Sequence, residues 1–111
     1  MRFKCKIWIT AEESEEAVIG KGRAALLRAI KEHNSLKKAA DELNMSYRAA
    51  WGKIRKAERR LGYKLIQTQT GGIGGGETSL TSEGLELLEK YDLFVEKVSE
   101  FANNLFDKVE F

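Results

Sequence analysis

A chain of 111 residues, 42% of them hydrophobic, can bury one core and is too short for a separate sensing domain of ordinary size, so we expect a single domain over residues 1–111. The absence of proline favours long helices. One cysteine excludes an internal disulfide, and neither a secretory signal nor an apolar run of about 18 residues is present, which predicts a soluble cytoplasmic protein with no membrane association.

The net charge of +2 hides a separation of the two signs along the chain. Residues 17–66 hold 13 cations and four acids, whereas residues 77–111 hold three lysines and nine acids. The basic middle is therefore expected to face a polyanion, because local charge steers association. Charge alone leaves open the alternative of two ordinary solvated faces.

The N-terminal residues alternate between apolar and polar types, which predicts a half-buried strand with the inward side chains Phe3, Cys5, Ile7 and Ile9. Cys5 is interpreted as a core residue on this strand. Residues 17–20 are expected to pair back, so that residues 1–20 form a strand or hairpin. Helical spacing then predicts a first helix from Arg23 until Asn34.

Two further helices are predicted, a short one over residues 36–43 capped by Ser35 and a longer one capped by Ser46 and ended by Gly62. A short turn between such helices is helix-turn-helix geometry, here at residues 35–61 within a helical region at 22–62. The second helix of this motif enters the major groove of DNA with its N-terminal residues leading. Its core stripe is predicted to be Tyr47, Ala50, Ile54, Ala57 and Leu61.

On the opposite side of this helix, cations alternate with small residues, which would let the backbone approach a groove while long side chains reach DNA. The residues expected nearest the bases are Ser46, Arg48, Ala49 and Lys53. Phosphate contacts are expected from Lys37, Arg55, Lys56 and Arg59. Tyr47 and Trp51 remain open between packing and DNA contact. The alternative is that these charges belong to the surface of an ordinary helical bundle.

Residues 64–81 combine two short β-compatible segments with a glycine-rich loop, which predicts a β-hairpin, or wing. The loop lacks the Gly-Lys-Ser/Thr ending of a nucleotide-binding loop and does not open a helix, so nucleotide binding is not expected. Backbone amides at a glycine turn can approach DNA, for which we select Thr70, Gly71, Gly72, Gly74 and Gly75. A flexible linker is the alternative.

A final helix over residues 82–108, capped by Thr81 or Ser82, has apolar residues that step alternately by three and four, as in a heptad seam. The predicted dimer interface consists of Leu88, Tyr91, Val95, Val98, Ala102, Leu105 and Val109. Wholly intramolecular packing is the alternative. The expected fold is therefore α+β and mostly helical: a winged helix-turn-helix with an N-terminal strand or hairpin and a long C-terminal dimerisation helix.

The order of these motifs resembles the N-terminal DNA-binding domain of the molybdate-responsive ModE-type transcriptional regulators, itself similar to the LysR-type DNA-binding domain. The resemblance covers most of the chain. It rests on Gly20-Lys21-Gly22-Arg23 with Ala25-Leu26-Leu27 and Ala29-Ile30, Ser35 with Ala39-Ala40 and Leu43, Met45-Ser46-Tyr47-Arg48 with Ala50-Trp51, the wing segment Thr70-Gly71-Gly72-Ile73-Gly74-Gly75-Gly76, and Leu80-Thr81 with Gly84.

The resemblance implies a winged helix domain, a dimer formed through N- and C-terminal elements, and palindromic operators near molybdate-uptake or molybdenum-cofactor genes. Full-length members of the family carry a C-terminal oxyanion-binding domain. We expect the DNA-binding domain to stand alone here, so no residue is assigned to molybdate sensing, and an effector-binding partner is not visible in the sequence.

These features predict a sequence-specific, double-stranded DNA-binding transcriptional regulator that acts as a homodimer on an inverted-repeat operator. The alternative is a nonspecific architectural DNA-binding module or a protein-interaction adaptor. No enzyme activity, cofactor or metal site is expected. His33 ends the first helix away from any evident cluster of carboxylates or thiols in the sequence, and is interpreted as interacting with the C-terminal end of that helix.

Overall fold

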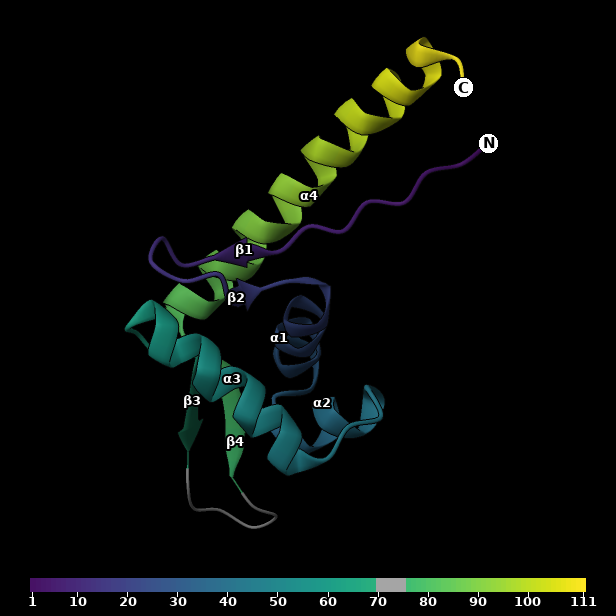
Figure 1. The fold of residues 1–111 in the computed structure, drawn as a ribbon. Coiled ribbons are helices and arrows are strands. Elements are labelled where there is room, and N and C mark those ends of the chain that lie inside the picture. Colours follow the sequence, from purple (N-terminus) through teal and green to yellow (C-terminus); the bar gives the residue numbers. More distant parts are fainter. Residues whose placement is uncertain (70–75) are drawn as a thin grey trace.

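The computed structural model describes residues 1–69 and 76–111 of the chain. The described residues form, in order, β1 (Ile9–Thr10), β2 (Ala17–Ile19), α1 (Lys21–His33), α2 (Leu36–Glu42), α3 (Tyr47–Leu61), β3 (Ile66–Gln69), β4 (Glu77–Leu80) and α4 (Ser82–Val109) (Figure 1). The expected α+β, mostly helical fold is confirmed. The five wing-loop residues selected for DNA contact, Thr70, Gly71, Gly72, Gly74 and Gly75, lie outside the described residues.

The helix boundaries follow from local capping. Ser35 and Ser46 accept hydrogen bonds from backbone amides three residues on, at 3.1 and 3.0 Å, and Thr81 caps α4 in the same way at 2.9 Å. Gly62 ends α3 with a φ of 82°, a left-handed conformation that glycine adopts without steric cost. The caps predicted from the sequence are confirmed, with Thr81 rather than Ser82 at the last helix.

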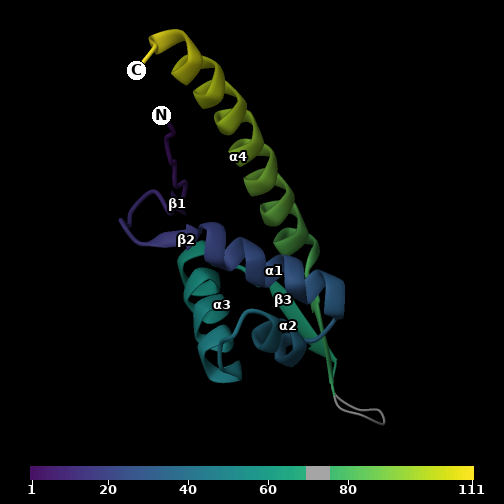
Figure 2. The same ribbon diagram turned by 90° about the vertical axis from the view of Figure 1, so that its right-hand side faces the viewer.

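The hydrophobic core forms around α1, which packs against α2, α3, α4 and β4 (Figure 2). Its largest fully buried side chains are Ile19, Leu26, Leu27, Ile30, Leu36, Ile54 and Leu65. Burying a side chain of this size contributes about 1.5–3 kcal/mol, so this cluster is the main source of stability for the helix-turn-helix. No helix within residues 1–69 or 76–111 is long and apolar enough to cross a membrane.

Two antiparallel hairpins lie at the edges of the helical core. In the wing, Ile66 pairs with Leu80 and Gln69 pairs with Glu77, which sets the register of β3 on β4. In the N-terminal hairpin, Ile9 pairs with Ile19, as expected for residues 17–20. The wing extends from the core at the end opposite the C-terminus (Figure 1).

The N-terminal strand is shorter than predicted. Only Ile9 and Thr10 pair with a partner strand, and the preceding residues run in an extended conformation beside α4 (Figures 1 and 2). The hydroxyl of Tyr91 on α4 donates to the Ile7 carbonyl at 2.6 Å, while burial and the nearby Asp92 raise the pKa of this hydroxyl. Cys5 is exposed, so its interpretation as a core residue is wrong.

The long helix α4 divides into a packed half and a projecting half. Gly84, Leu88 and Tyr91 are buried in the core of the chain itself. This burial removes Leu88 and Tyr91 from the predicted dimer interface, because a buried side chain has no surface to offer a second copy. The C-terminal half of α4 extends away from the other helices (Figure 1).

Candidate nucleic-acid interface

The helix-turn-helix places one side of α3 on the molecular surface. Ala50, Ile54 and Ala57 are completely buried and fix the opposite side against the core. Among the predicted contacts that the structure describes, Trp51 is half-buried and Lys37 on α2 is exposed. The exposed contacts on α3 and its cap are Ser46, Tyr47, Arg48, Ala49, Lys53, Arg55, Lys56 and Arg59. The cations of α3 therefore lie on the side of the helix that faces away from its buried stripe, and Lys37 is exposed on the neighbouring α2, as expected for a surface that binds a polyanion.

Most cations of this face are not engaged within the protein. Among the described residues, no acidic side chain forms an ion pair with Arg48, Lys53, Lys56, Arg59 or Lys37. Such cations carry a positive field outward that an internal partner would otherwise cancel. The face is therefore available to an anionic ligand.

Arg55 differs from its neighbours because it already has two partners. Its guanidinium lies 4.5 Å from the centroid of the Trp51 ring, a cation–π contact, and 3.2 Å from the carboxylate of Glu58. A phosphate contact by Arg55 would have to share the guanidinium with Glu58. Arg55 is thus positioned as a link between the exposed face and the buried carboxylate.

Tyr47 does not belong to the core stripe, contrary to the sequence prediction. Half of its surface is exposed, and its ring meets Trp51 edge to face at a centroid distance of 6.3 Å. Tyr47 begins α3 and lies three residues before Ala50, the first buried residue of that helix. The Tyr47–Trp51 pair forms an aromatic border along one side of the basic face.

Gly52 lies at the middle of the same face. A Cβ atom built at this position would meet nothing within 4 Å, so packing inside the chain does not require glycine here. Glycine in a helix interior destabilises the helix by about 0.5–1 kcal/mol relative to alanine. The residue leaves room for another molecule to approach the backbone between Arg48 and Lys53.

Glu58 joins α3 to the root of the wing, a role that the sequence reasoning missed. Its buried carboxylate accepts backbone hydrogen bonds from Leu65 at 2.8 Å and Ile66 at 3.4 Å, and its second oxygen faces Arg55 and Lys64. One carboxylate therefore sets the position of β3 relative to α3. The available signal was that Glu58 is the one acid in this basic helix.

Two arginines, Arg23 on α1 and Arg60 in the last turn of α3, bind the N-terminal hairpin. Arg23 and Arg60 both donate to the Ala17 carbonyl, at 3.0 and 2.5 Å, and Arg60 also pairs with Glu16. Burial and the neighbouring Arg60 lower the pKa of the Arg23 guanidinium. These two cations act within the fold, which distinguishes them from the unengaged cations of the exposed face.

The second helix of the helix-turn-helix, α3, is basic and exposed, and an antiparallel wing is hydrogen-bonded to it. These features define the winged helix-turn-helix class of protein. Residues 23–85 match the family described as "Bacterial regulatory helix-turn-helix protein, lysR family". The match covers more than half of the chain, so the chain belongs to this family. The family consists of transcription regulators, in agreement with the expectation that the chain is a DNA-binding regulator and no enzyme.

Curated relatives agree with the resemblance identified from the motifs. The chain is 32% identical to "Transcriptional regulator ModE" of Haemophilus influenzae over 97 residues, covering 87% of this chain and 38% of the relative. It is 29% identical to "DNA-binding transcriptional dual regulator ModE" of Escherichia coli (strain K12), covering 85% of this chain and 36% of the relative. The chain thus spans less than two fifths of the length of these relatives.

Solved structures share the fold at lower sequence identity. The BenM DNA-binding domain in complex with benA site 1 DNA matches with a TM-score of 0.56 at 20% identity, covering 80% of this chain and 94% of that chain. ArgP from Mycobacterium tuberculosis matches with a TM-score of 0.53 at 23% identity, covering 75% of this chain and 29% of that chain.

Proposed function

We propose that this chain binds double-stranded DNA sequence-specifically and regulates transcription as a homodimer on an inverted-repeat operator. The observation that carries the proposal is the exposed face of α3, where Arg48 and Lys53 flank Gly52 and form no ion pair with the rest of the described chain. The printed name of the Escherichia coli relative and the DNA complex of the BenM domain support it.

The two kinds of contact in this proposal have different consequences. Ser46, Arg48, Ala49 and Lys53 lie toward the leading end of α3 and contact base edges, which carries sequence preference. Lys37, Lys56 and Arg59 bind phosphates, which supplies affinity without preference, and Arg55 reaches a phosphate only while still bound to Glu58. The wing-loop amides at residues 70–75 remain part of the proposal as additional backbone contacts.

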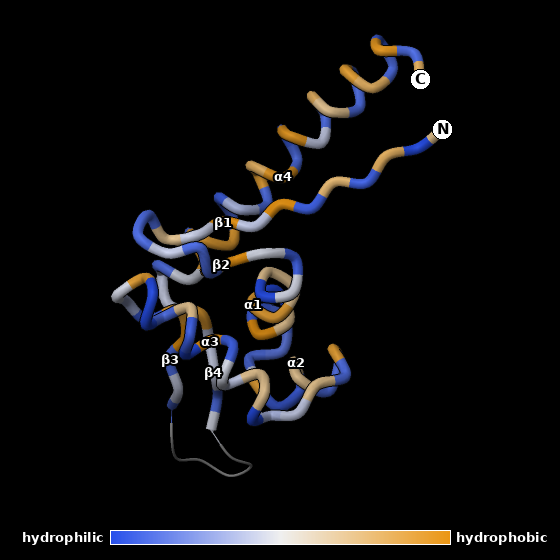
Figure 3. Tube along the Cα trace, in the orientation of Figure 1, coloured by the Kyte–Doolittle hydropathy of each residue, from blue (hydrophilic) through white to orange (hydrophobic). Residues whose placement is uncertain are grey.

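The homodimer rests on the apolar surface of the projecting half of α4. Phe94, Phe101, Leu105 and Val109 are between 49% and 69% exposed, and hydrophobic residues recur along this half of the helix (Figure 3). Val95, Val98 and Ala102 are half-buried beside them. A two-fold dimer through this surface would present two copies of α3 to half-sites about 34–36 Å apart, or a multiple of that spacing.

The molybdenum-related names of the relatives support a link to molybdate or another oxyanion, although no residue of this chain is assigned to that ligand. A DNA partner implies a location in the cytoplasm of a bacterial cell. We place the binding of any effector on a partner or a further domain, because no residue of this chain is assigned to it.

The test is selection of bound sequences from a random DNA pool, followed by titration of the selected operator against random DNA. Arg48→Ala and Lys53→Ala should each weaken operator binding by about 1–3 kcal/mol and relax the sequence preference. Lys56→Ala should weaken binding to both DNAs equally and lower the slope of log affinity against log salt by about 0.9. Lys90→Ala, on the acidic side of the molecule, is the matched control and should change neither.

A failure to select any sequence would exclude specific recognition and favour the architectural alternative. Operator binding that is unchanged in both Arg48→Ala and Lys53→Ala would show that the reading face lies elsewhere. A chain that remains monomeric at micromolar concentration would instead favour an adaptor whose α4 surface binds a different protein.

A further inference from the structure

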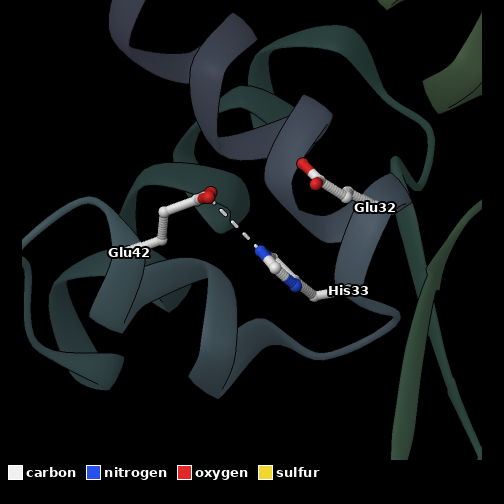
Figure 4. A group of neighbouring side chains, drawn as sticks. All are labelled: Glu32, His33 and Glu42. Atoms are coloured by element: carbon white, nitrogen blue, oxygen red, sulfur yellow. Dashed lines mark ion pairs between the residues drawn. The ribbon is translucent and has the colours of Figure 1, made fainter.

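A cluster outside the proposed DNA face lies where the last turn of α1 meets the end of α2. Figure 4 shows His33 facing Glu42 across the corner between the two helices, with Glu32 beside it. The Nε2 atom of His33 lies 3.4 Å from Oε1 of Glu42. One nitrogen or oxygen atom from each of the three residues lies within 4.8 Å of the other two.

The imidazole of His33 faces the Glu42 carboxylate at ion-pair distance but forms no hydrogen bond within the described residues. Its Nε2 atom is buried, yet within the described part of the chain it forms no hydrogen bond, since the Glu42 oxygen lies near it but outside hydrogen-bonding geometry. Buried polar atoms in proteins nearly always form a hydrogen bond, so a buried nitrogen that has only a nearby carboxylate requires an explanation. Two atoms that bind the same metal ion also lie close together without a hydrogen bond between them.

We propose that Glu32, His33 and Glu42 bind a divalent transition-metal ion, for which Zn²⁺ is the best match. Ligand atoms about 2.0–2.2 Å from a tetrahedral zinc ion lie about 3.4 Å from each other, which equals the His33–Glu42 separation. The exposed Glu32 side chain can close the remaining gap by rotation, and water takes the fourth position. One imidazole and two carboxylates favour zinc over Mg²⁺, which prefers oxygen ligands.

The position of this site gives the ion a defined effect on the fold. The ion would join the C-terminal end of α1 to the last residue of α2, the first helix of the helix-turn-helix. The next residue, Asn34, accepts a hydrogen bond from the backbone amide of Thr78 in β4 at 3.1 Å. Zinc binding therefore stabilises the corner from which both α2 and the wing are supported, and raises the unfolding temperature of the domain.

The experiment is a Zn²⁺ titration of the full chain carrying Cys5→Ser, which removes the exposed thiol as a competing ligand. His33 is the one histidine of the sequence, so its imidazole nitrogen resonances report on the site without ambiguity. We expect saturation at one ion per chain, a shift of the Nε2 resonance and a rise in unfolding temperature. Mg²⁺ at the same concentration should produce none of these changes.

The carboxylate variants test the ligand set without altering the core. Glu42→Gln and Glu32→Gln should each weaken Zn²⁺ binding by about tenfold or more, because even outer-shell partners of a metal site contribute this much. Glu89→Gln, an exposed acid on α4, is the matched control and should bind as the parent does. Circular dichroism of each variant without metal verifies that it is folded.

An imidazole resonance that does not move at stoichiometric Zn²⁺ would refute the site. Equal affinity in the parent and in Glu42→Gln would also refute it, since binding would then occur at unrelated surface carboxylates. Neither outcome depends on DNA binding, so the proposed function stands or fails separately.

Discussion

At the scale of single residues, Glu58 has the widest influence on the candidate interface. Taking a carboxylate out of water is costly unless hydrogen bonds and nearby cations compensate, and here two backbone amides and Arg55 do so. The same contacts fix the wing beside α3. Glu58, which lies outside the proposed set of DNA contacts, thus holds the wing in a fixed position relative to α3.

Glu58→Gln tests this role. We expect the free energy of unfolding to fall by about 1–3 kcal/mol, because the amide is a weaker acceptor and its NH₂ group repels the donors around it. Urea denaturation measures the loss. The exposed Glu89→Gln should stay within about 0.5 kcal/mol of the parent. An equally small change for Glu58→Gln would mean that the wing is held by its other contacts.

Gly52 allows a prediction in which stability and binding change in opposite directions. Gly52→Ala should stabilise the chain by about 0.5–1 kcal/mol, because alanine favours the helix and its Cβ meets no other atom. The same methyl group should weaken operator binding, measured by fluorescence anisotropy, because it occupies the space between the cations. Gly22→Ala, also open around its Cβ, should leave DNA affinity unaltered. Unaltered affinity in Gly52→Ala would argue against close approach of DNA at this point.

At the scale of elements, the wing is held on two sides. Glu58 holds β3 to α3, and Thr81 holds it to α4 by donating its amide to the Leu65 carbonyl at 2.9 Å and its hydroxyl to the Lys64 carbonyl at 2.8 Å. Thr81 also caps α4. The start of the long helix and the root of the wing are therefore one structural unit.

Gly84→Ala tests this unit. The new Cβ would lie 2.1 Å from the Leu65 carbonyl oxygen, so β3 or α4 must move. We expect a loss of about 1–3 kcal/mol and a lower unfolding temperature, although alanine by itself favours a helix by up to about 1 kcal/mol. Thermal unfolding measures whether the variant is less or more stable than the parent. Stabilisation by Gly84→Ala would mean that the contact between the new Cβ and the Leu65 carbonyl is relieved at no cost.

At the scale of the whole molecule, α4 gives the chain its elongated shape, with extents of 59 × 30 × 23 Å. The N-terminal segment covers part of the projecting half, where the rings of Phe3 and Phe106 lie 4.9 Å apart. The row from Phe94 to Val109 stays uncovered within the described chain. An apolar surface of this extent on a projecting helix is the expected mark of an association surface.

Phe101→Glu should convert the proposed dimer to a monomer in sedimentation equilibrium at micromolar concentration. Phe101 is 69% exposed, so the substitution should leave the fold intact while placing a charge in the apolar row. Asn103→Glu adds the same charge on the opposite side of α4 and should leave the dimer unchanged. A monomeric parent chain, or a dimeric Phe101→Glu variant, would contradict the interface.

Local features of the sequence were sufficient for the helix-turn-helix. The Ser35 and Ser46 caps, the stop at Gly62 and the apolar spacing of α2 and α3 depend on interactions a few residues apart, so they could be read without a tertiary structure. The accessible cations of α3 followed from the same periodicity, because the position of its core stripe determines which side remains exposed.

Packing between distant segments settled the rest. Apolar periodicity predicted that Leu88 and Phe101 lie on the same helix. Only the path of α1 decides that Leu88 is buried within its own chain and that Phe101 is exposed. Likewise, the burial of Glu58 depends on where β3 returns, and the approach of His33 to Glu42 depends on the angle between α1 and α2. These features arise from contacts that periodicity along one segment does not encode.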